Sequence, residues 1–434
     1  MFLSPVDSTD LGIEFDTQYP SFDKNFKNTL PTIKTIEYIK IFQQKLLTSK
    51  ESLAKLITLT MGKMYHESLQ EVHRSIKTID NYLHHFYSLK GTSDNLSKYE
   101  ETNKQLFTNY YPLGSILCMV PFNFPVNLAF HKIIPALLMK NFVFYRPHPQ
   151  TDAVGNFLIR LLYESGFQSS EIIKFLPSPS DLQKVFQEKS IQAISFTGGA
   201  KVASIIQKNC GLKKTLFELG GNDPIVLFPD GDKTLFIKKV LEHRLGCAGQ
   251  RCTSAKRIFI HQSIYPKVKE ELFFLLKQIS AENPFSDHPL GPLVSSESAS
   301  HLYTTFSSFA LLSTKPHEAY LNPILVEGNN YLNLFTEEFF GPIFAIFSFD
   351  STEHVLSMIS TSPYMLQAGI FTENLSILKE CFQSLAAGTV LHNEGPSYRL
   401  DSIDFGGGSI YSGLSREGGN STLLEMSCLK NLIL

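Results

Sequence analysis

The chain has 434 residues, enough for two or three domains that each bury a substantial core. Hydrophobic residues make up 43% and charged residues 18%, a balance that is typical of a folded globular protein and excludes a disordered one. The formal net charge of −2 gives no electrostatic reason to expect nucleic acid or an anionic membrane as a partner.

Cysteine usage and the hydrophobic pattern narrow the setting further. The six cysteines lie far apart and form no Cys-x-x-Cys pair, which favours a reducing, cytoplasmic location. No nearby histidine or acid joins Cys247 and Cys252 in a ligand set, so we expect no metal. The N-terminus lacks a basic region followed by an apolar core, and no run of eighteen apolar residues occurs, so we expect neither a signal peptide nor a membrane span.

The first part of the chain predicts packing helices followed by a sheet. Apolar residues between Ile33 and Leu89 recur at helical spacing and are interrupted by Gly62, which predicts two or three helices. Strands are predicted over 106–111, 114–120 and 141–146, with a helix ending near Met139. Pro121 and Pro125 bound a short rigid loop that presents Asn123.

Strands and helices alternate through the rest of the chain. We expect helices over 154–165, 182–188, 201–208, 266–280 and from 353, and strands over 171–176, 191–196, 215–219, 224–228, 257–260, 324–327, 345–349, 369–372 and 428–434. Such alternation predicts mostly parallel sheets covered on both faces, with ligands beyond the carboxyl ends of the strands. Thr197-Gly-Gly-Ala200 stands at such an end and can approach a phosphate, although no Gly-x-Gly-x-x-Gly occurs.

Cys252 is the candidate nucleophile. It lies in Leu245-Gly-Cys-Ala-Gly-Gln-Arg-Cys-Thr-Ser254, a glycine-rich loop in which backbone N–H groups and Arg251 can support a thiolate. Cys118, by contrast, sits within an apolar run that is typical of a structural cysteine. A packed structural cysteine is the alternative for Cys252 when this stretch is considered alone.

Six short motifs together resemble the aldehyde dehydrogenase superfamily from about Ile33 to the C-terminus. They are Pro121-Phe-Asn-Phe-Pro125, Phe196-Thr-Gly198, Phe217-Glu-Leu-Gly-Gly221, Gly249-Gln-Arg-Cys252, Glu337-Glu-Phe-Phe-Gly-Pro342 and Phe405-Gly-Gly407. The motifs are most similar to those of lactaldehyde, phosphonoacetaldehyde and non-phosphorylating glyceraldehyde-3-phosphate dehydrogenases. The resemblance implies an α/β fold with two Rossmann-type parallel-sheet domains and a small β oligomerisation extension. The expected division is an NAD(P)-binding domain (1–102 and 119–228), a catalytic domain (229–410) and the extension (103–118 and 411–434).

The resemblance also implies the roles of three catalytic residues. Cys252 would attack an aldehyde carbon and carry the resulting acyl group as a thioester. The Asn123 amide would bind the oxyanion, and Glu218 would activate the water that hydrolyses the thioester. The implied activity is oxidation of an aldehyde to its carboxylic acid with NAD or NADP.

The cofactor site implied by the resemblance departs from the family pattern in places. Its residues would be Pro121, Phe122, Arg146, Pro147, Gly198, Gly199, Leu219, Glu338 and Phe340. Arg146 replaces a common lysine, and Gly199 replaces a common serine or threonine. Because His148-Pro149 replaces an acid found in many NAD-preferring members, no carboxylate there would repel the 2′-phosphate of NADP.

The substrate site is expected to include Arg251, Phe124 and Arg399. The two guanidinium groups can clamp a carboxylate or a phosphate, which would make the substrate a small anionic aldehyde. The alternative is that both arginines pair with local acids such as Asp401 or Asp404.

Two other functions stay open at the level of the sequence. In a CoA-acylating semialdehyde dehydrogenase, CoA instead of water would take the acyl group, and Glu218 argues against this. An inactive family member acting as a binding or structural protein is the other alternative, which the cofactor-site departures motivate. The β extension would expose a sheet edge unless it pairs with another subunit, so we expect a homodimer or a homotetramer.

Overall fold

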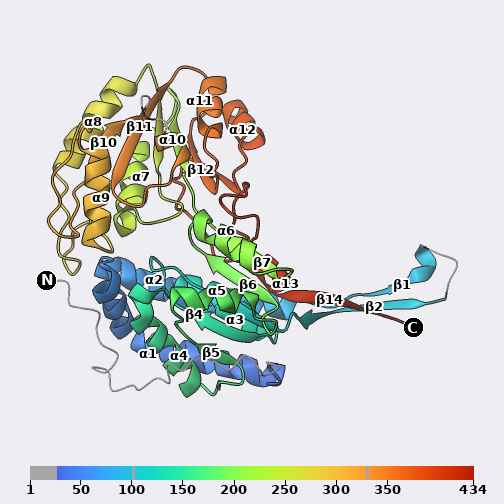
Figure 1. Ribbon diagram of the computed structural model, residues 1–434. Coiled ribbons are helices and arrows are strands. Elements are labelled where there is room, and N and C mark those ends of the chain that lie inside the picture. Colours follow the sequence, from blue (N-terminus) through green and yellow to red (C-terminus); the bar gives the residue numbers. More distant parts are fainter. Residues whose placement is uncertain (1–26, 100–102, 329–330, 332) are drawn as a thin grey trace.

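The computed structural model describes residues 27–99, 103–328, 331 and 333–434. Two α/β lobes stack on one another, and a narrow β extension projects from one of them (Figure 1). Residues 1–26 and 100–102 of the predicted first domain lie outside the described residues. Within the part that is described, no helix is long and apolar enough to cross a membrane.

Two long helices begin the described chain, as the apolar spacing predicts. Helix α1 (Thr32–Met61) buries Ile39, Phe42 and Leu46 on one stripe, and it ends where Gly62 adopts the left-handed conformation with φ 79°. Helix α2 (Tyr65–Ser88) packs along α1. The short turn between them places Lys63 and, at the start of α2, Glu67 beside the interface of the two lobes.

The first lobe contains a five-stranded parallel sheet in the order β5-β4-β3-β6-β7. Its strands are β3 (Ser115–Met119), β4 (Phe142–Arg146), β5 (Ile172–Lys174), β6 (Ala193–Thr197) and β7 (Lys214–Glu218). Helices α3 (Asn127–Leu138), α4 (Asp152–Glu164), α5 (Pro179–Gln187) and α6 (Ala200–Asn209) connect them. Because all the pairs are parallel, the ends of β4, β6 and β7 bring Arg146, Thr197 and Glu218 to one edge.

The second lobe contains a six-stranded parallel sheet in the order β10-β11-β9-β8-β12-β13. Its strands are β8 (Pro224–Leu227), β9 (Arg257–His261), β10 (Ile324–Glu327), β11 (Ile343–Phe349), β12 (Gln367–Phe371) and β13 (Thr389–His392). Helices α7 (Lys233–Leu245), α8 (Tyr265–Lys277), α9 (Ser296–Phe306), α10 (Asn333–Thr336), α11 (Thr352–Ser360) and α12 (Leu375–Ser384) complete the lobe. The sequence prediction did not include α7, α9, α10, α12 or β13.

The two parallel sheets meet at the carboxyl ends of the strands of one sheet and the amino ends of the strands of the other. Strand β7 ends at Glu218, and β8 begins only a few residues later at Pro224, after the Gly220-Gly221 turn. The loop that carries Cys252 leads into the amino end of β9. The carboxyl edge of the five-stranded sheet therefore meets the amino edge of the six-stranded sheet.

The third sheet is antiparallel and forms the projecting extension (Figure 1). It consists of β1 (Ser93–Asn95), β2 (Gln105–Pro112) and β14 (Ser427–Ile433), with Leu106 opposite Ile433. Strand β3, which we assigned to the extension, instead pairs with β4 and β6 in the five-stranded sheet. Its side chains are buried on both faces, which suits the interior of a parallel sheet.

Candidate active site

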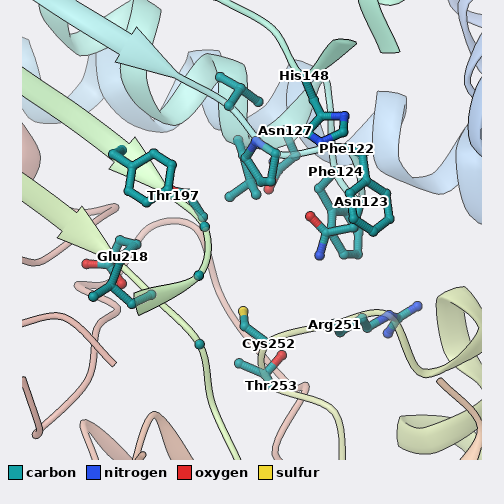
Figure 2. A pocket seen from close by; sticks show the side chains of 18 of the residues that line it. Phe122, Asn123, Phe124, Asn127, His148, Thr197, Glu218, Arg251, Cys252 and Thr253 are labelled. Atoms are coloured by element: carbon teal, nitrogen blue, oxygen red, sulfur yellow. The ribbon is translucent and has the colours of Figure 1, made fainter. Parts of the chain in front are cut away.

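A cavity of about 760 Å³ lies where the two parallel sheets meet. Every residue that the sequence analysis assigned to the site lines it except Pro147, which is buried beside Gly155 of α4. Figure 2 shows the Cys252 sulfur pointing into the space that separates Glu218 from Asn123. Three segments distant in the sequence thus bring a thiol, a carboxylate and an amide to one cavity.

Cys252 lies in a tightly constrained loop. The preceding turn (Gly246–Gly249) contains two residues with positive φ, Cys247 at 54° and Ala248 at 51°. Lys256 Nζ donates to the Cys252 carbonyl oxygen at 2.7 Å, which holds the peptide of the candidate nucleophile. Burial raises the pKa of the Cys252 thiol to about 12, and the charge of Lys256 opposes that rise.

Glu218 is buried at the end of β7. Neither of its carboxylate oxygens accepts a hydrogen bond from the described residues. Burial first, and the nearby negative charge of Glu417 second, raise the pKa of Glu218 well above its ordinary value. A carboxylate in this state is able to take a proton from water near neutral pH.

Two charged residues near Glu218 were not identified from the sequence. Lys132 Nζ on α3 lies 3.1 Å from a carboxylate oxygen of Glu417 and 3.3 Å from Ser195 Oγ. The signal for Lys132 was its position in an otherwise apolar helix, where an isolated charge needs a partner. Glu417 carried no such signal, because its partners Lys132 and Arg399 lie 285 and 18 positions away.

Asn123 is oriented from both sides. One N–H of its amide donates to the Gln250 carbonyl oxygen at 2.8 Å, which leaves the second N–H of that group. Lys63 Nζ donates to the backbone carbonyl oxygen of Asn123 at 2.6 Å and pairs with the Glu71 carboxylate at 2.5 Å. Glu71 in turn accepts from the backbone N–H groups that follow the loop. The sequence analysis missed Lys63 and Glu71, which fix the loop.

The cofactor end of the cavity consists of Phe122, Arg146, His148, Thr197, Gly198 and Gly199. Arg146 Nε and Thr197 Oγ1 are buried, and no described residue is their hydrogen-bond partner. Gly199 stands at the N-terminus of α6 with no side-chain cap, and a Cβ there would meet open space. Unsatisfied polar atoms beside a free helix N-terminus fit the phosphates and hydroxyls of a dinucleotide.

Two titratable groups at this end respond to burial. Burial lowers the pKa of Arg146 from its ordinary value. Burial, followed by the charge of Arg146, lowers the pKa of His148 to about 4, so the imidazole is neutral at pH 7. The His148 ring meets the Phe122 ring edge to face at 5.5 Å between centroids.

The substrate end of the cavity consists of Lys63, Glu67, Arg74, Phe124, Arg251 and Arg399. Arg251 pairs with Glu67 at 2.9 Å, an acid 184 positions away. Arg399 lies 3.2 Å from Glu417 and 3.5 Å from Asp401. Arg399 thus has Asp401 as a neighbour, as the alternative of local pairing describes, whereas Asp404 accepts from Ser421.

The two arginines at the substrate end each have an Nε that makes no hydrogen bond with the described residues. Arg251 Nε and Arg399 Nε are both buried, and neither donates a hydrogen bond to a residue that the structure describes. The Arg251 guanidinium lies 5.6 Å from the centroid of the Phe124 ring, which shapes the wall beside it. Both arginines thus line the cavity and pair with acids at the same time.

A model of the aldehyde dehydrogenase family matches residues 23–432. The chain belongs to the aldehyde dehydrogenase family. It is 34% identical to a sulfoacetaldehyde dehydrogenase from Neptuniibacter caesariensis, over 88% of this chain and 86% of the relative. It is 28% identical to a lactaldehyde dehydrogenase from Methanococcus maripaludis, over 94% of this chain and 89% of the relative.

Solved structures agree with this aldehyde dehydrogenase assignment. A glyceraldehyde-3-phosphate dehydrogenase from Methanocaldococcus jannaschii, in complex with NADP, superposes with a TM-score of 0.88 at 26% identity, covering 94% of this chain and 90% of the other. An NADP-dependent glyceraldehyde-3-phosphate dehydrogenase from Bacillus halodurans gives 0.90 at 26% identity, covering 94% and 87%. The predicted fold is confirmed, and this aldehyde dehydrogenase is an oxidoreductase that uses NAD or NADP.

Proposed function

We propose that this aldehyde dehydrogenase oxidises a small anionic aldehyde to its carboxylic acid through a thioester on Cys252, which water activated by Glu218 then hydrolyses. The observation that supports this proposal most strongly is that Cys252, Glu218 and Asn123 reach one cavity from three separate segments. A reacting carbonyl group requires such convergence of nucleophile, base and hydrogen-bond donor.

The proposed chemistry assigns one role to each of the three residues. The Cys252 thiolate adds to the aldehyde carbon and forms a hemithioacetal. Its oxyanion accepts a hydrogen bond from the second N–H of the Asn123 side-chain amide. Bound NAD(P)⁺ supplies the hydride acceptor that turns this adduct into a thioester. Glu218 removes a proton from water, the water oxygen attacks the acyl carbon, and the carbon–sulfur bond breaks to release the acid and regenerate the thiolate.

A free donor at the substrate end supports an anionic substrate. Arg251 Nε is a buried donor that lacks an acceptor within the described chain, and a carboxylate, sulfonate or phosphate oxygen would supply one. Arg399 Nε makes no hydrogen bond with the described residues, although it lies 3.5 Å from a carboxylate oxygen of Asp401. Two of the similar proteins are named for sulfoacetaldehyde and glyceraldehyde 3-phosphate, which both carry an anionic group. The shared chemistry is an aldehyde with an anionic group a few bonds from the carbonyl carbon.

Glu218 favours hydrolysis over acyl transfer to CoA. A buried carboxylate with a raised pKa in the same cavity as Cys252 suits the activation of water. The CoA-acylating alternative has less use for that base, and an inactive protein would have no reason to keep the three groups together.

The test follows the absorbance of reduced nicotinamide with sulfoacetaldehyde, lactaldehyde, glyceraldehyde 3-phosphate and a neutral aldehyde, with and without CoA. We expect activity without CoA and its loss in Cys252→Ala by at least about 10⁴-fold. Cys381→Ala is the matched control, because Cys381 is a buried cysteine that does not line the cavity. Turnover that survives in Cys252→Ala would contradict the assignment of the nucleophile.

We also propose that the extension pairs with another copy of the chain in a homodimer or a homotetramer. Strand β14 is an edge of its sheet, and Leu429, Leu432 and Ile433 are more than half exposed on it. Light scattering after size-exclusion chromatography measures the mass in solution. A monomer at micromolar concentration would refute this proposal.

A further inference from the structure

Lys256 is a buried charge that the proposed chemical steps do not use. It lies in the loop between Cys252 and β9, and its side chain is only 3% exposed. Its ammonium group donates to the carbonyl oxygens of Arg251 at 2.8 Å and Cys252 at 2.7 Å, and to Glu338 Oε1 at 2.9 Å. An ammonium group has three N–H donors, so all of them are engaged.

The acid at the other end of this contact is itself held in place. Glu338 Oε1 also accepts from the Gly221 backbone N–H at 2.9 Å. A Cβ at Gly221 would clash with the Cys252 carbonyl oxygen, and a Cβ at Gly220 would clash with the Glu338 carboxylate. Lys256 therefore joins the nucleophile loop to Glu338, which also contacts the turn that follows Glu218.

Glu338 connects this assembly to the cofactor. It lines the cavity together with Phe340, whose ring centroid lies 5.1 Å from the Lys256 ammonium. The family resemblance implies that both residues contact the nicotinamide half of NAD(P). The same ammonium thus contacts the peptide of the thiol and the acid that faces the cofactor.

We propose that Lys256 is a positioning residue that holds the Cys252 peptide and Glu338 in one arrangement, so that thiol reactivity and cofactor binding depend on the same ammonium group. This inference rests on the proposed role of Cys252 as the nucleophile. It assigns Lys256 no contact with the substrate.

The charges around the Cys252 thiol predict the direction in which each substitution moves the pKa of this thiol. The groups that act on Cys252 are the cations Lys256 and Arg399 and the acids Glu338 and Asp223. Burial raises the pKa of Cys252, the two cations oppose the rise, and the two acids reinforce it. Removing the charge of Lys256 must therefore make the thiolate scarcer, and removing the charge of Glu338 must make it more abundant.

The experiment measures alkylation of cofactor-free protein by iodoacetamide between pH 7 and 10, with the Cys252 peptide quantified by mass spectrometry. We expect Lys256→Met to slow the reaction about tenfold at fixed pH, as a rise of one pKa unit requires, and Glu338→Gln to accelerate it about threefold. Free cysteine added to each sample is the control for the reagent and should react equally in the samples of all variants.

A second measurement follows NADP binding by titration calorimetry. Both substitutions should weaken binding by about fivefold or more, although they shift the thiol in opposite directions. A merely structural role would not produce opposite effects on the thiol combined with the same effect on the cofactor.

Three outcomes decide the inference. Unchanged alkylation of Cys252 in folded Lys256→Met would overturn it. Circular dichroism shows whether Lys256→Met folds. If it does not fold, the alkylation rate of Cys252 in Glu338→Gln is the test, and a rate equal to or below that of the wild type overturns the inference. An active wild type with an unchanged Lys256→Met profile rejects this inference alone, whereas activity retained in Cys252→Ala rejects the proposed function.

Discussion

At the substrate end of the cavity each cation pairs with an acid, whereas at the cofactor end Arg146 pairs with no acid among the described residues. The pairs at the substrate end are Lys63–Glu71, Arg74–Asp401, Arg251–Glu67 and Arg399–Glu417. The unsatisfied atoms at the cofactor end are Arg146 Nε and Thr197 Oγ1. The ion pairs therefore hold the side chains of the substrate end in place without a ligand. At the cofactor end, a bound ligand would supply the missing hydrogen-bond partners.

The energetic reason lies in the cost of burying polar groups. A buried donor or acceptor without a partner costs about 1–3 kcal/mol, and a bound nucleotide can recover that cost. In a buried ion pair each charge is instead compensated by the other, without a ligand. Removal of one member leaves the other charge uncompensated. Glu218 lines the same cavity, and both of its oxygens are unsatisfied by the described chain.

The largest effect is expected from Glu218→Gln, which removes the proposed base from the cavity that contains both ends. Steady-state turnover should fall about 10²–10⁴-fold, because the amide cannot take a proton from water. A burst of reduced nicotinamide close to one per site should remain, since formation of the thioester does not need Glu218. Stopped-flow absorbance measures both phases, and loss of the burst together with the steady state would contradict the assigned role.

Lys63→Met breaks the most deeply buried pair of the substrate end. Both partners are fully buried, so the unpaired Glu71 should destabilise the fold by about 3–5 kcal/mol. Urea unfolding followed by circular dichroism measures the loss. The double variant Lys63→Met/Glu71→Leu is the matched control and should recover much of it; a double variant as unstable as the single one would show that the uncompensated charge is not the cause.

Arg251→Ala tests whether the paired end still recognises an anion. The value of kcat/KM should fall about 10–100-fold for an anionic aldehyde and change little for a neutral aldehyde of similar length. Glu67→Gln keeps an acceptor for the Cys247 N–H but removes the charge opposite Arg251, so it should favour the anionic substrate. Equal losses for both substrates in Arg251→Ala would argue for a structural role alone.

Arg146→Ala tests the unsatisfied end. The KM for NADP should rise about tenfold and the KM for NAD should rise less, because an arginine pairs with a phosphate more strongly than with a hydroxyl group. Arg160→Ala on α4 is the matched control, since Arg160 pairs with Glu164 and does not line the cavity. Unchanged KM values for both cofactors would separate Arg146 from the nucleotide site.

The smallest expected effect is a shift in pH dependence in Glu417→Gln. The pKa of Glu417 is lowered to about 2, so the group is charged at neutral pH, and its charge raises the pKa of Glu218. Removing that charge lowers the pKa of the base, so the acid limb of the kcat profile should move to lower pH. A limb that stays fixed or moves to higher pH would contradict the electrostatic account.

Short motifs carried enough information to predict the fold and to select candidates for the reactive residues. The loop around Cys252, the rigid loop around Asn123 and the turn after Glu218 each depend on local glycine or proline chemistry that the sequence displays. The alternation of strands and helices likewise predicted parallel sheets, because the hydrophobic periods of 2 and 3.6 residues are local properties. The assigned roles of the site residues stay predictions.

What surrounds those residues was decided by the tertiary structure. Glu71, Lys132, Lys256 and Glu417 pair with oppositely charged residues that lie between 8 and 285 positions away, and no local pattern records such a distance. The boundary of the extension also depended on packing, because β3 is buried on both faces by segments far from it in the sequence.

The amino-acid sequence by itself determined which side chains are capable of the chemistry and which segments form strands and helices. Only the tertiary structure decided that the carboxyl edge of one parallel sheet faces the amino edge of the other and encloses those side chains in one cavity. The physical reason is that periodicity and turn chemistry act over a few residues. Charge pairing, burial and the pKa shifts that follow from them are set by neighbours in space.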